Sequence, residues 1–165
     1  MNTSDNEHLE SVIRHISNVR SACELLARRL ILHGEDEFAL ALIANAMTHD
    51  QSKFHGVEWL YLRPQMAKNN PDMFMIALET HQSTNEHHPE YWGGLNEMPK
   101  IYIAEMVCDW YARSTEMGTG LRGWIKDEAT KKYDMSLHGK AYKHIKKFVD
   151  ILLDPEFKAV PLDEP

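Results

Sequence analysis

The sequence predicts an all-α fold, arranged as a single compact domain with about five to six main helices. No stretch shows the sustained alternation of apolar and polar residues that a half-buried strand requires, and several long segments repeat apolar residues at helical spacing. The chain has 165 residues, of which 43% are hydrophobic and 26% charged. This size and composition are typical of one soluble globular domain. We expect residues 1–155 to form this domain and residues 156–165 to form an extended or mobile tail.

Two helices are predicted in the first third of the chain. Residues 5–32 form a long amphipathic helix, because apolar residues recur three or four positions apart, and Gly34 ends it. Residues 35–49 form the second helix, whose acidic first turn suits the positive end of the helix dipole. The other expected segments are a loop-like region with a short helix at 53–70, a helix at 73–84 preceded by Pro71, a long irregular connection at 85–100, a helix at 99–115 and a last helix at 136–153.

The charge distribution bears on the class of partner. A net charge of −7 has the wrong sign for a dedicated duplex-binding protein. Residues 122–147 carry eight Lys and Arg against three Asp and Glu, whereas the rest of the chain is acidic. This basic segment suits a small phosphorylated substrate as well as a nucleic acid, and a solvated lysine-rich helix face explains it equally well. We expect a small phosphorylated partner rather than a nucleic acid, and the oligomeric state stays open.

Three features bear on the compartment. No apolar run approaches the roughly 18 residues of a membrane span. The first ten residues are polar and acidic, unlike a signal or transit peptide. Cys23 and Cys108 lie within apolar helical patterns, which is typical of buried thiols in a reducing compartment. We expect a cytoplasmic protein with no membrane partner.

Ligand-type side chains lie on the predicted inner faces of three helices. His15 shares a helical stripe with Val19 and therefore points at the core. His49 has the same relation to the apolar residues of the second helix, and Asp50 follows it directly. Asp109 lies within the apolar run IYIAEMVCDWYA, where a buried carboxylate needs a partner.

A divalent cation shared by His15, His49, Asp50 and Asp109 would satisfy all four groups together. Two imidazoles and two carboxylates suit Mn, Fe, Co, Ni or Zn. Separate structural roles stay open at each position. An inward His is often a hydrogen-bonded core residue, an Asp after a His at a helix end is often a cap, and Asp109 can pair with Arg113.

The order of these residues, a histidine, a His-Asp doublet and a distant aspartate on helices, resembles the HD-domain phosphohydrolase superfamily. The similarity covers residues 13–114, with 34 residues from His15 to His49 and 59 from Asp50 to Asp109. The resemblance implies a helical domain of the HD type that binds metal and hydrolyses phosphate esters, mostly of nucleotides.

Three strings extend the resemblance toward the cyclic-dinucleotide phosphodiesterase branch of this superfamily. HDQSKF at 49–54 is similar to its HDxxK form, HHPEYWGGL at 87–95 to its HH-containing loop, and IYIAEMVCDWYARST at 101–115 to its last ligand helix. With His81 the order becomes H…HD…H…HH…D, which the superfamily uses to hold two or more metals. The glycine-tyrosine-proline triplet of that branch is absent and His81 is only six residues before His87, so we do not assign its substrate.

Two further resemblances concern small proteins. The deoxynucleotide 5′-nucleotidases and related phage dATP triphosphohydrolases match in size and in the four-ligand pattern, but they have an acidic residue where this chain has Lys53. The chain is also similar to a set of small phage-encoded proteins that carry the HHPEYW string. The resemblance therefore identifies a small, phage-type member of the superfamily.

The resemblance implies a role for each candidate residue. Asp50 bridges two metals and takes part in catalysis, Lys53 lies near the substrate phosphate, and Glu105 orients a ligand or accepts a proton. A surface lysine and a simple salt bridge are the alternatives for the last two. The implied metal ligands are His15, His49, Asp50, Asp109, His81, His87 and His88, with the choice between the last two open. The candidate substrate-binding residues are Lys53, Tyr91 and Trp92, whose rings can stack on a base or pack the loop, and Arg122 and Lys126.

We therefore predict an enzyme, a metal-dependent phosphohydrolase that cleaves a phosphate ester of a nucleotide or related small molecule. It would use water activated by one or two divalent transition metals, Mn, Co, Fe, Ni or Zn. Two alternatives stay open. One is a di-iron oxygenase of the same fold, and the other is a non-catalytic helical binding or accessory protein with a structural metal site.

Overall fold

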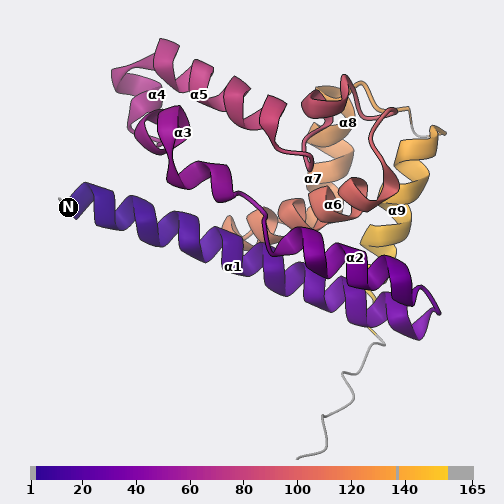
Figure 1. The fold of residues 1–165 in the computed structure, drawn as a ribbon. Coiled ribbons are helices and arrows are strands. Elements are labelled where there is room, and N and C mark those ends of the chain that lie inside the picture. The colour runs from indigo at the N-terminus through magenta and orange to yellow at the C-terminus, as the bar shows by residue number, and fades with distance from the viewer. Residues whose placement is uncertain (1–2, 137, 156–165) are drawn as a thin grey trace, which may run out of the picture.

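A helix of 30 residues, α1 (Thr3–Leu32), runs the length of the molecule and carries two groups of shorter helices (Figure 1). The structure is a computed structural model that describes residues 3–136 and 138–155, and the predicted tail at 156–165 lies outside the described residues. Within the described ranges the chain is helical and has no β-strand, which confirms the predicted all-α fold. None of the helices in these ranges combines the length and the apolarity needed to cross a bilayer.

The remaining elements follow in chain order. They are α2 (Asp36–Ala46), the 3₁₀ helix η1 (Gln51–Phe54), α3 (Gly56–Tyr61), α4 (Met66–Asn69), α5 (Pro71–Thr84), the 3₁₀ helix η2 (Pro89–Trp92), α6 (Lys100–Glu116), α7 (Leu121–Trp124), the π-helical segment η3 (Ile125–Ala129), α8 (Thr130–Lys132) and α9 (Lys140–Leu152).

The body of the molecule, which we define as α1, α2 and the helices from α6 to α9, contains the hydrophobic core. Val19, Cys23, Leu26 and Leu30 recur every three or four residues along α1 and are completely buried. This stripe packs against α2, α6 and α9. Phe148 of α9 is also completely buried. Burial of each large apolar side chain stabilises the fold by about 1.5–3 kcal/mol, so this cluster is the main source of stability of the body.

Residues 55–84 form a second unit, which we call the lobe. It consists of α3, α4 and α5 and lies over the N-terminal half of α1 (Figure 1). Pro71 occupies the first turn of α5, at the helix start that it predicted. The side chain of Asn70 accepts a hydrogen bond from the Met73 amide and caps this helix. The connection at 85–99 leads the chain back to the body and contains η2.

Two helix ends differ from the prediction. Helix α2 ends at Ala46 instead of His49, because residues 47–50 form a turn in which Asp50 has a φ of 59°. A residue in the left-handed region cannot continue a right-handed helix. The last helix starts at Lys140 instead of Ser136, since Gly139 before it has an extended backbone.

A helical stretch at 121–132, formed by α7, η3 and α8, is missing from the prediction. Gly118 and Gly120 predict a break after the helix at 99–115, and Gly118, with a φ of 65°, does lie just beyond the end of α6. Leu121, Ile125 and Ala129 nevertheless recur every four residues and are buried. That spacing was a helical signal that the glycines obscured.

Candidate metal centre

The centre of the site is Asp50, which the local backbone turns inward. Asp50 lies between the end of α2 and the start of η1, and its left-handed conformation is one that Asp tolerates better than most residues. Only 1% of its surface is exposed. A buried carboxylate on a strained turn requires surroundings that compensate both costs.

One oxygen of Asp50 faces the body. Oδ2 lies 3.5 Å from Nε2 of His15 on α1 and 3.5 Å from Nε2 of His49. Oδ1 of Asp109, on α6, lies 3.1 Å from the same His15 nitrogen. The four residues that the sequence singled out as a ligand set therefore meet at one point.

The other oxygen of Asp50 faces the lobe and the connection after it. Oδ1 lies 3.3 Å from Nε2 of His81 on α5 and 3.5 Å from Nε2 of His87. Nε2 of His88 lies 3.0 Å from that of His81. Asp50 thus stands between two sets of imidazoles, with one oxygen directed at each.

A second layer of carboxylates fixes three of these rings from behind. Nδ1 of His15 lies 3.1 Å from Oε1 of Glu116, Nδ1 of His49 lies 2.9 Å from Oε1 of Glu105, and Nδ1 of His81 lies 2.8 Å from Oε2 of Glu58. A carboxylate only accepts, so each Nδ1 carries the proton and donates it. In the neutral ring the Nε2 lone pair then points at the centre, which is the arrangement that second-layer carboxylates give to metal-binding histidines.

The centre therefore contains more hydrogen-bond acceptors than donors. Among the described residues, three buried atoms lack a hydrogen-bond partner here: Nε2 of His49, Nε2 of His87 and Oδ1 of Asp50. Such atoms cost free energy unless something positive satisfies them. The ligand atoms of His15, His49 and Asp50 lie within 4.8 Å of one another, and so do those of His81, His87 and His88. Imidazole nitrogens with carboxylate oxygens suit divalent transition metals, so the donor set fits a metal ion on each side of Asp50.

The electrostatics favour ionised carboxylates at Asp50 and Asp109 and neutral imidazoles at His87 and His88. His49 differs, because burial lowers its pKa but the charge of Asp50 and the hydrogen bond with Glu105 outweigh burial and raise it. Burial would raise the pKa of Asp50, but the charge of Lys53 and the neighbouring histidines hold that pKa well below its usual range. Burial likewise opposes ionisation of Asp109, but the contact with His15 and the charges of His49 and His87 together outweigh burial and lower the pKa. Burial, followed by repulsion from His49, lowers the pKa of His87 well below its ordinary value. Burial and repulsion from His81 lower the pKa of His88 to about 3. A carboxylate must be ionised and an imidazole must be neutral to bind a metal ion, so the states of Asp50, Asp109, His87 and His88 suit metal ligands.

Lys53 is attached directly to the centre. Its ammonium Nζ lies 2.5 Å from Oδ2 of Asp50, because the 3₁₀ turn of η1 brings residue i+3 back over residue i. The lysine side chain is 16% exposed, so the charge lies at the edge of the centre. Lys53 therefore lies beside the His-Asp doublet, and its predicted contact with a substrate phosphate stays a prediction.

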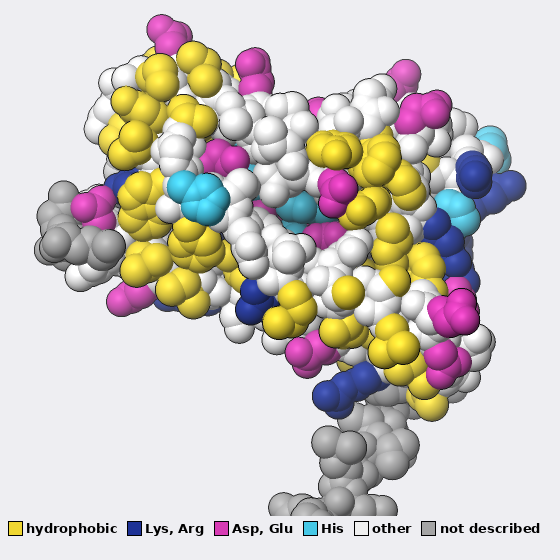
Figure 2. All heavy atoms as spheres, in the orientation of Figure 1, with side chains coloured by type: hydrophobic (Ala, Val, Ile, Leu, Met, Phe, Trp, Pro, Cys, Tyr) yellow, Lys and Arg dark blue, Asp and Glu magenta, His cyan; other side chains and the backbone are white. Residues whose placement is uncertain are grey.

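Access to the centre is polar. A cavity of about 210 Å³ reaches His49, Asp50 and His87, and it is lined by polar side chains that include Glu86 and Tyr102. In Figure 2, histidine and acidic side chains are visible in a hollow near the middle of the face that is shown. The cavity can admit water and a small polar group.

The predicted aromatic residues lie beside the centre in the connection. Trp92 donates its indole N–H to the Glu86 carbonyl at 2.8 Å, and its ring centre lies 5.3 Å from that of Tyr102, so its described contacts pack the loop. Tyr91 is 42% exposed, and its ring edge contacts Trp92. A stacking role for either ring stays a prediction.

The predicted cations of the basic segment do not join the centre. Arg122 pairs with Asp150 on α9, with Nη1 2.7 Å from Oδ1, and Lys126 lies exposed on η3. Neither has a contact with the metal centre among the described residues. Arg113, the alternative partner considered for Asp109, pairs with Glu116 instead, at 2.9 Å.

Sequence reasoning missed two functional positions, Glu58 and Glu116. Glu116 had a usable signal, because it follows Glu105 by eleven residues and Asp109 by seven, which places all three on one face of α6. Glu58 had none, since its position depends on how α3 packs beneath α5.

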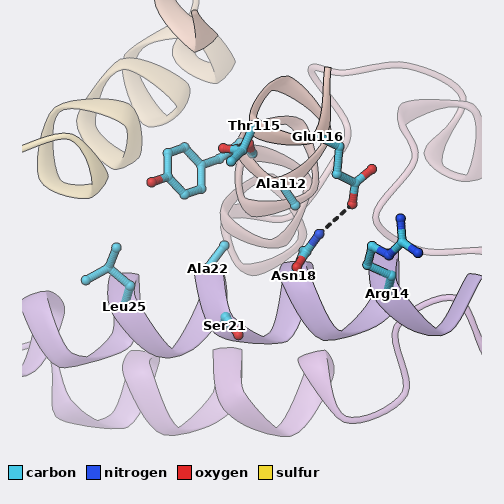
Figure 3. Close-up of a pocket in the computed structure, with 9 residues that line it drawn as sticks. Arg14, Asn18, Ser21, Ala22, Leu25, Ala112, Thr115 and Glu116 are labelled. Carbon is cyan, nitrogen blue, oxygen red and sulfur yellow. Dashed lines mark hydrogen bonds between the residues drawn. The ribbon is translucent and has the colours of Figure 1, made fainter. Parts of the chain in front are cut away.

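A surface groove borders the centre on the side of Glu116. It has a volume of about 480 Å³ and lies between α1 and α6. Figure 3 shows Arg14 and Asn18 of α1 near Glu116, with Asn18 Nδ2 donating to Glu116 Oε1 at 2.9 Å. The same oxygen accepts from His15, so Glu116 links the groove to the metal centre.

Comparison with known proteins gives one match. A family model described as "Family of unknown function (DUF5662)" matches residues 4–151, which include every residue of the centre. No curated protein and no solved structure matches the chain significantly.

Proposed function

The chain belongs to the DUF5662 family, and we propose that it is a metal-dependent phosphohydrolase of the HD-domain type, acting on a phosphate ester of a nucleotide or a related small molecule. The observation that carries the proposal is the position of Asp50. Its two oxygens face two imidazole sets, at 3.3–3.5 Å, and three buried atoms of the centre lack partners.

Two groups of residues would hold the metal ions. His15, His49 and Asp109 would hold an ion on the Oδ2 side of Asp50, and His81 with His87 or His88 would hold one on the Oδ1 side. When bound, such ions supply Lewis acidity, a bound water of lowered pKa and neutralisation of the charge that develops on phosphoryl oxygens. Mn, Fe, Co, Ni and Zn all suit this donor set.

The protein's own residues supply orientation and charge. Glu58, Glu105 and Glu116 hold three imidazoles in the tautomer that leaves Nε2 free for a ligand bond. Lys53 lies against Asp50 at the edge of the centre, and an ammonium there attracts a substrate phosphate. Glu105 also borders the polar cavity, where it can accept a proton from a water molecule.

The substrate class follows from the size and charge of the access. The polar cavity leaves room beside the centre for a phosphoryl group rather than for a polymer, and the overall acidity of the chain disfavours a nucleic-acid duplex. The exposed ring of Tyr91 is available to stack on a base. We therefore expect a small phosphorylated substrate in a soluble compartment.

Two measurements test the proposal. The full chain, stripped with a chelator and reloaded with Mn, Co or Zn, should contain at least one metal per chain by elemental analysis. The loaded protein should release phosphate, or a nucleoside monophosphate, from a panel of dNTPs, NMPs, cyclic dinucleotides and a generic aryl phosphodiester. His33→Ala is the matched control, because His33 is exposed at the far end of α1 and the variant should keep both properties.

The outcomes separate the alternatives. Metal content together with hydrolysis supports the proposal. Metal content without hydrolysis of any member of the panel leaves the two alternatives, the binding or accessory protein and the di-iron oxygenase. Absence of metal after reconstitution removes the basis of the proposal.

A further inference from the structure

The lobe lies outside the main apolar core of the molecule. The buried apolar cluster of the body and the partly buried side chains that pack on it include no member from residues 55–84, all of which the structure describes. In the ribbon the lobe stands apart from α2 and α9 (Figure 1). The lobe therefore does not share in the burial of this cluster, which is the main force that holds the helices of the body together.

Two described contacts between the lobe and α1 are an ion pair and a ring contact. Arg63 Nη1 pairs with Oδ1 of Asp5 at 2.7 Å, and the side chain of Asp5 is 30% exposed. The ring centres of Trp59 and His8 lie 4.8 Å apart. Arg63 is buried but Asp5 is partly exposed, so the pair contributes on the order of 1 kcal/mol and does not fix the lobe by itself.

The metal centre joins the lobe to the body. His81 on α5 and Glu58 on α3 are its two lobe members, and both are buried. His81 faces Asp50 at 3.3 Å and His88 at 3.0 Å, and Glu58 also accepts from Ser52 of η1 at 2.9 Å. The buried part of the junction is therefore polar and contains ligand-type atoms.

We propose that a metal ion bound by His81, Asp50 and the His87/His88 pair clasps the lobe onto the body. When this half of the centre lacks metal, the lobe separates from the body while the body stays folded. The proposal rests on the metal binding in the proposed function and does not depend on hydrolysis. It assigns to the Oδ1 half of the centre control over the conformation of residues 55–84.

The balance of charges explains the direction of the effect. Glu58 fixes the proton of His81 on Nδ1, so the Nε2 lone pair faces a carboxylate oxygen of Asp50. Two acceptors at 3.3 Å repel each other, and a hydrogen bond from His88 relieves only part of this. A cation between them turns the repulsion into two bonds. Any opening that separates His81 from Asp50 must then release the ion.

Amide hydrogen exchange measures this opening directly. In the metal-free full chain, amides of α3 and α5 should exchange faster than those of the body, since the lobe opens without global unfolding. Free metal at a hundredfold excess over its dissociation constant should slow the lobe amides about 100-fold, because opening is coupled to release of the ion. The probes are Mn²⁺, Co²⁺ and Zn²⁺, with metal content measured in parallel.

Two variants make the test specific. His81→Ala removes the only metal ligand that the lobe contributes. The ion bound by His15, His49 and Asp109 should still slow exchange in the body, while the lobe amides stay fast. His33→Ala, at an exposed position, should behave like the wild-type chain. The titration of the wild-type chain needs no variant, so a poorly folded His81→Ala protein leaves the proposal testable.

Each outcome has a definite reading. Slowing of the lobe in the wild type and its loss in His81→Ala support the clasp. The clasp is overturned if metal binds and the lobe amides are unaffected, if lobe and body already exchange together in the metal-free chain, or if the lobe slows equally in His81→Ala. If the wild-type chain binds no metal, the proposed function fails as well, and elemental analysis distinguishes that case from the others.

Discussion

Glu105 Oε1 lies 2.9 Å from Nδ1 of His49, and both side chains are buried. Since the carboxylate only accepts, it fixes the proton of His49 on Nδ1 and directs the Nε2 lone pair toward Asp50. Glu105 is therefore a positioning residue, which is one of the two roles that the sequence left open for it; the other, accepting a proton, stays a prediction.

Glu105→Ala should lower the affinity for metal by about 10–100-fold, the usual effect of losing a second-layer partner. Glu105→Gln is the matched control, because its amide oxygen can still accept from Nδ1 and keeps the tautomer. Titration of chelator-stripped protein with Co²⁺, followed by the visible absorption of the bound ion, measures the affinity. Equal affinities in the wild type and Glu105→Ala would show that His49 needs no partner behind it.

Asp50→Ala should abolish hydrolysis of whichever phosphate ester the panel identifies, with a loss of about 10²–10⁴-fold in rate that corresponds to several kcal/mol in the barrier. Asp50 faces both imidazole sets, so its loss affects both halves of the centre together. The helical content should stay near that of the wild type, because the core of the body does not include Asp50.

Circular dichroism is the fold control for this variant. Near-native turnover of a folded Asp50→Ala protein would mean that the His-Asp doublet is not a catalytic site here. The binding-protein alternative would then be preferred.

The ligand set could be predicted because its members follow rules that are local in sequence. His15 and Asp109 occupy positions on helical faces whose other members are apolar, so the period of 3.6 residues alone places them inward, with His15 buried and Asp109 partly buried. The doublet of His49 and Asp50 needed no long-range information either. The three helices that were predicted to carry these ligand-type residues, α1, α2 and α6, exist in the structure. Their packing brings His15, the doublet after α2 and Asp109 together.

What could not be predicted depends on tertiary packing. The left-handed turn at Asp50 depends on its buried surroundings, which the local sequence does not show. The apolar pattern therefore predicted a helix that ends at His49, whereas α2 ends at Ala46. The role of Glu58 depends on α3 lying beneath α5. The position of Arg122 depends on α9, which supplies its partner Asp150. None of these has a signature in the neighbouring sequence.

Glu35 should stabilise the fold in a pH-dependent way. It pairs with Lys147 of α9 and Lys100 of α6, at 2.5 and 3.1 Å, and so ties the start of α2 to both helices. The hydrogen bond from Lys147 is the largest cause that lowers the pKa of Glu35 below its ordinary value. A lowered folded-state pKa means that the stabilisation is present at neutral pH and is lost as the pH falls through that pKa, below about 4.3.

Glu35→Gln should therefore lower the free energy of unfolding by about 1 kcal/mol at pH 7, since these partners are partly exposed. Its effect should shrink toward zero at pH 3.5. Urea titrations of both proteins at the two pH values measure this difference. An effect that is the same at both pH values would contradict an electrostatic origin.

Lys53→Ala should weaken substrate binding more than it slows the chemical step. The ammonium lies at the edge of the centre, 2.5 Å from Asp50, and it is partly exposed toward solvent. A cation that contacts the substrate phosphate in both the ground state and the transition state contributes uniform binding, so its loss raises KM and leaves kcat comparatively unchanged. Charge-assisted hydrogen bonds of this kind are worth about 1.5–3 kcal/mol, which corresponds to roughly a 10–100-fold rise in KM. Lys53→Arg is the matched control, because it keeps the charge and should retain most of the affinity. Steady-state kinetics of the metal-loaded proteins give both constants, and a fall in kcat at constant KM would instead assign Lys53 a role confined to the transition state.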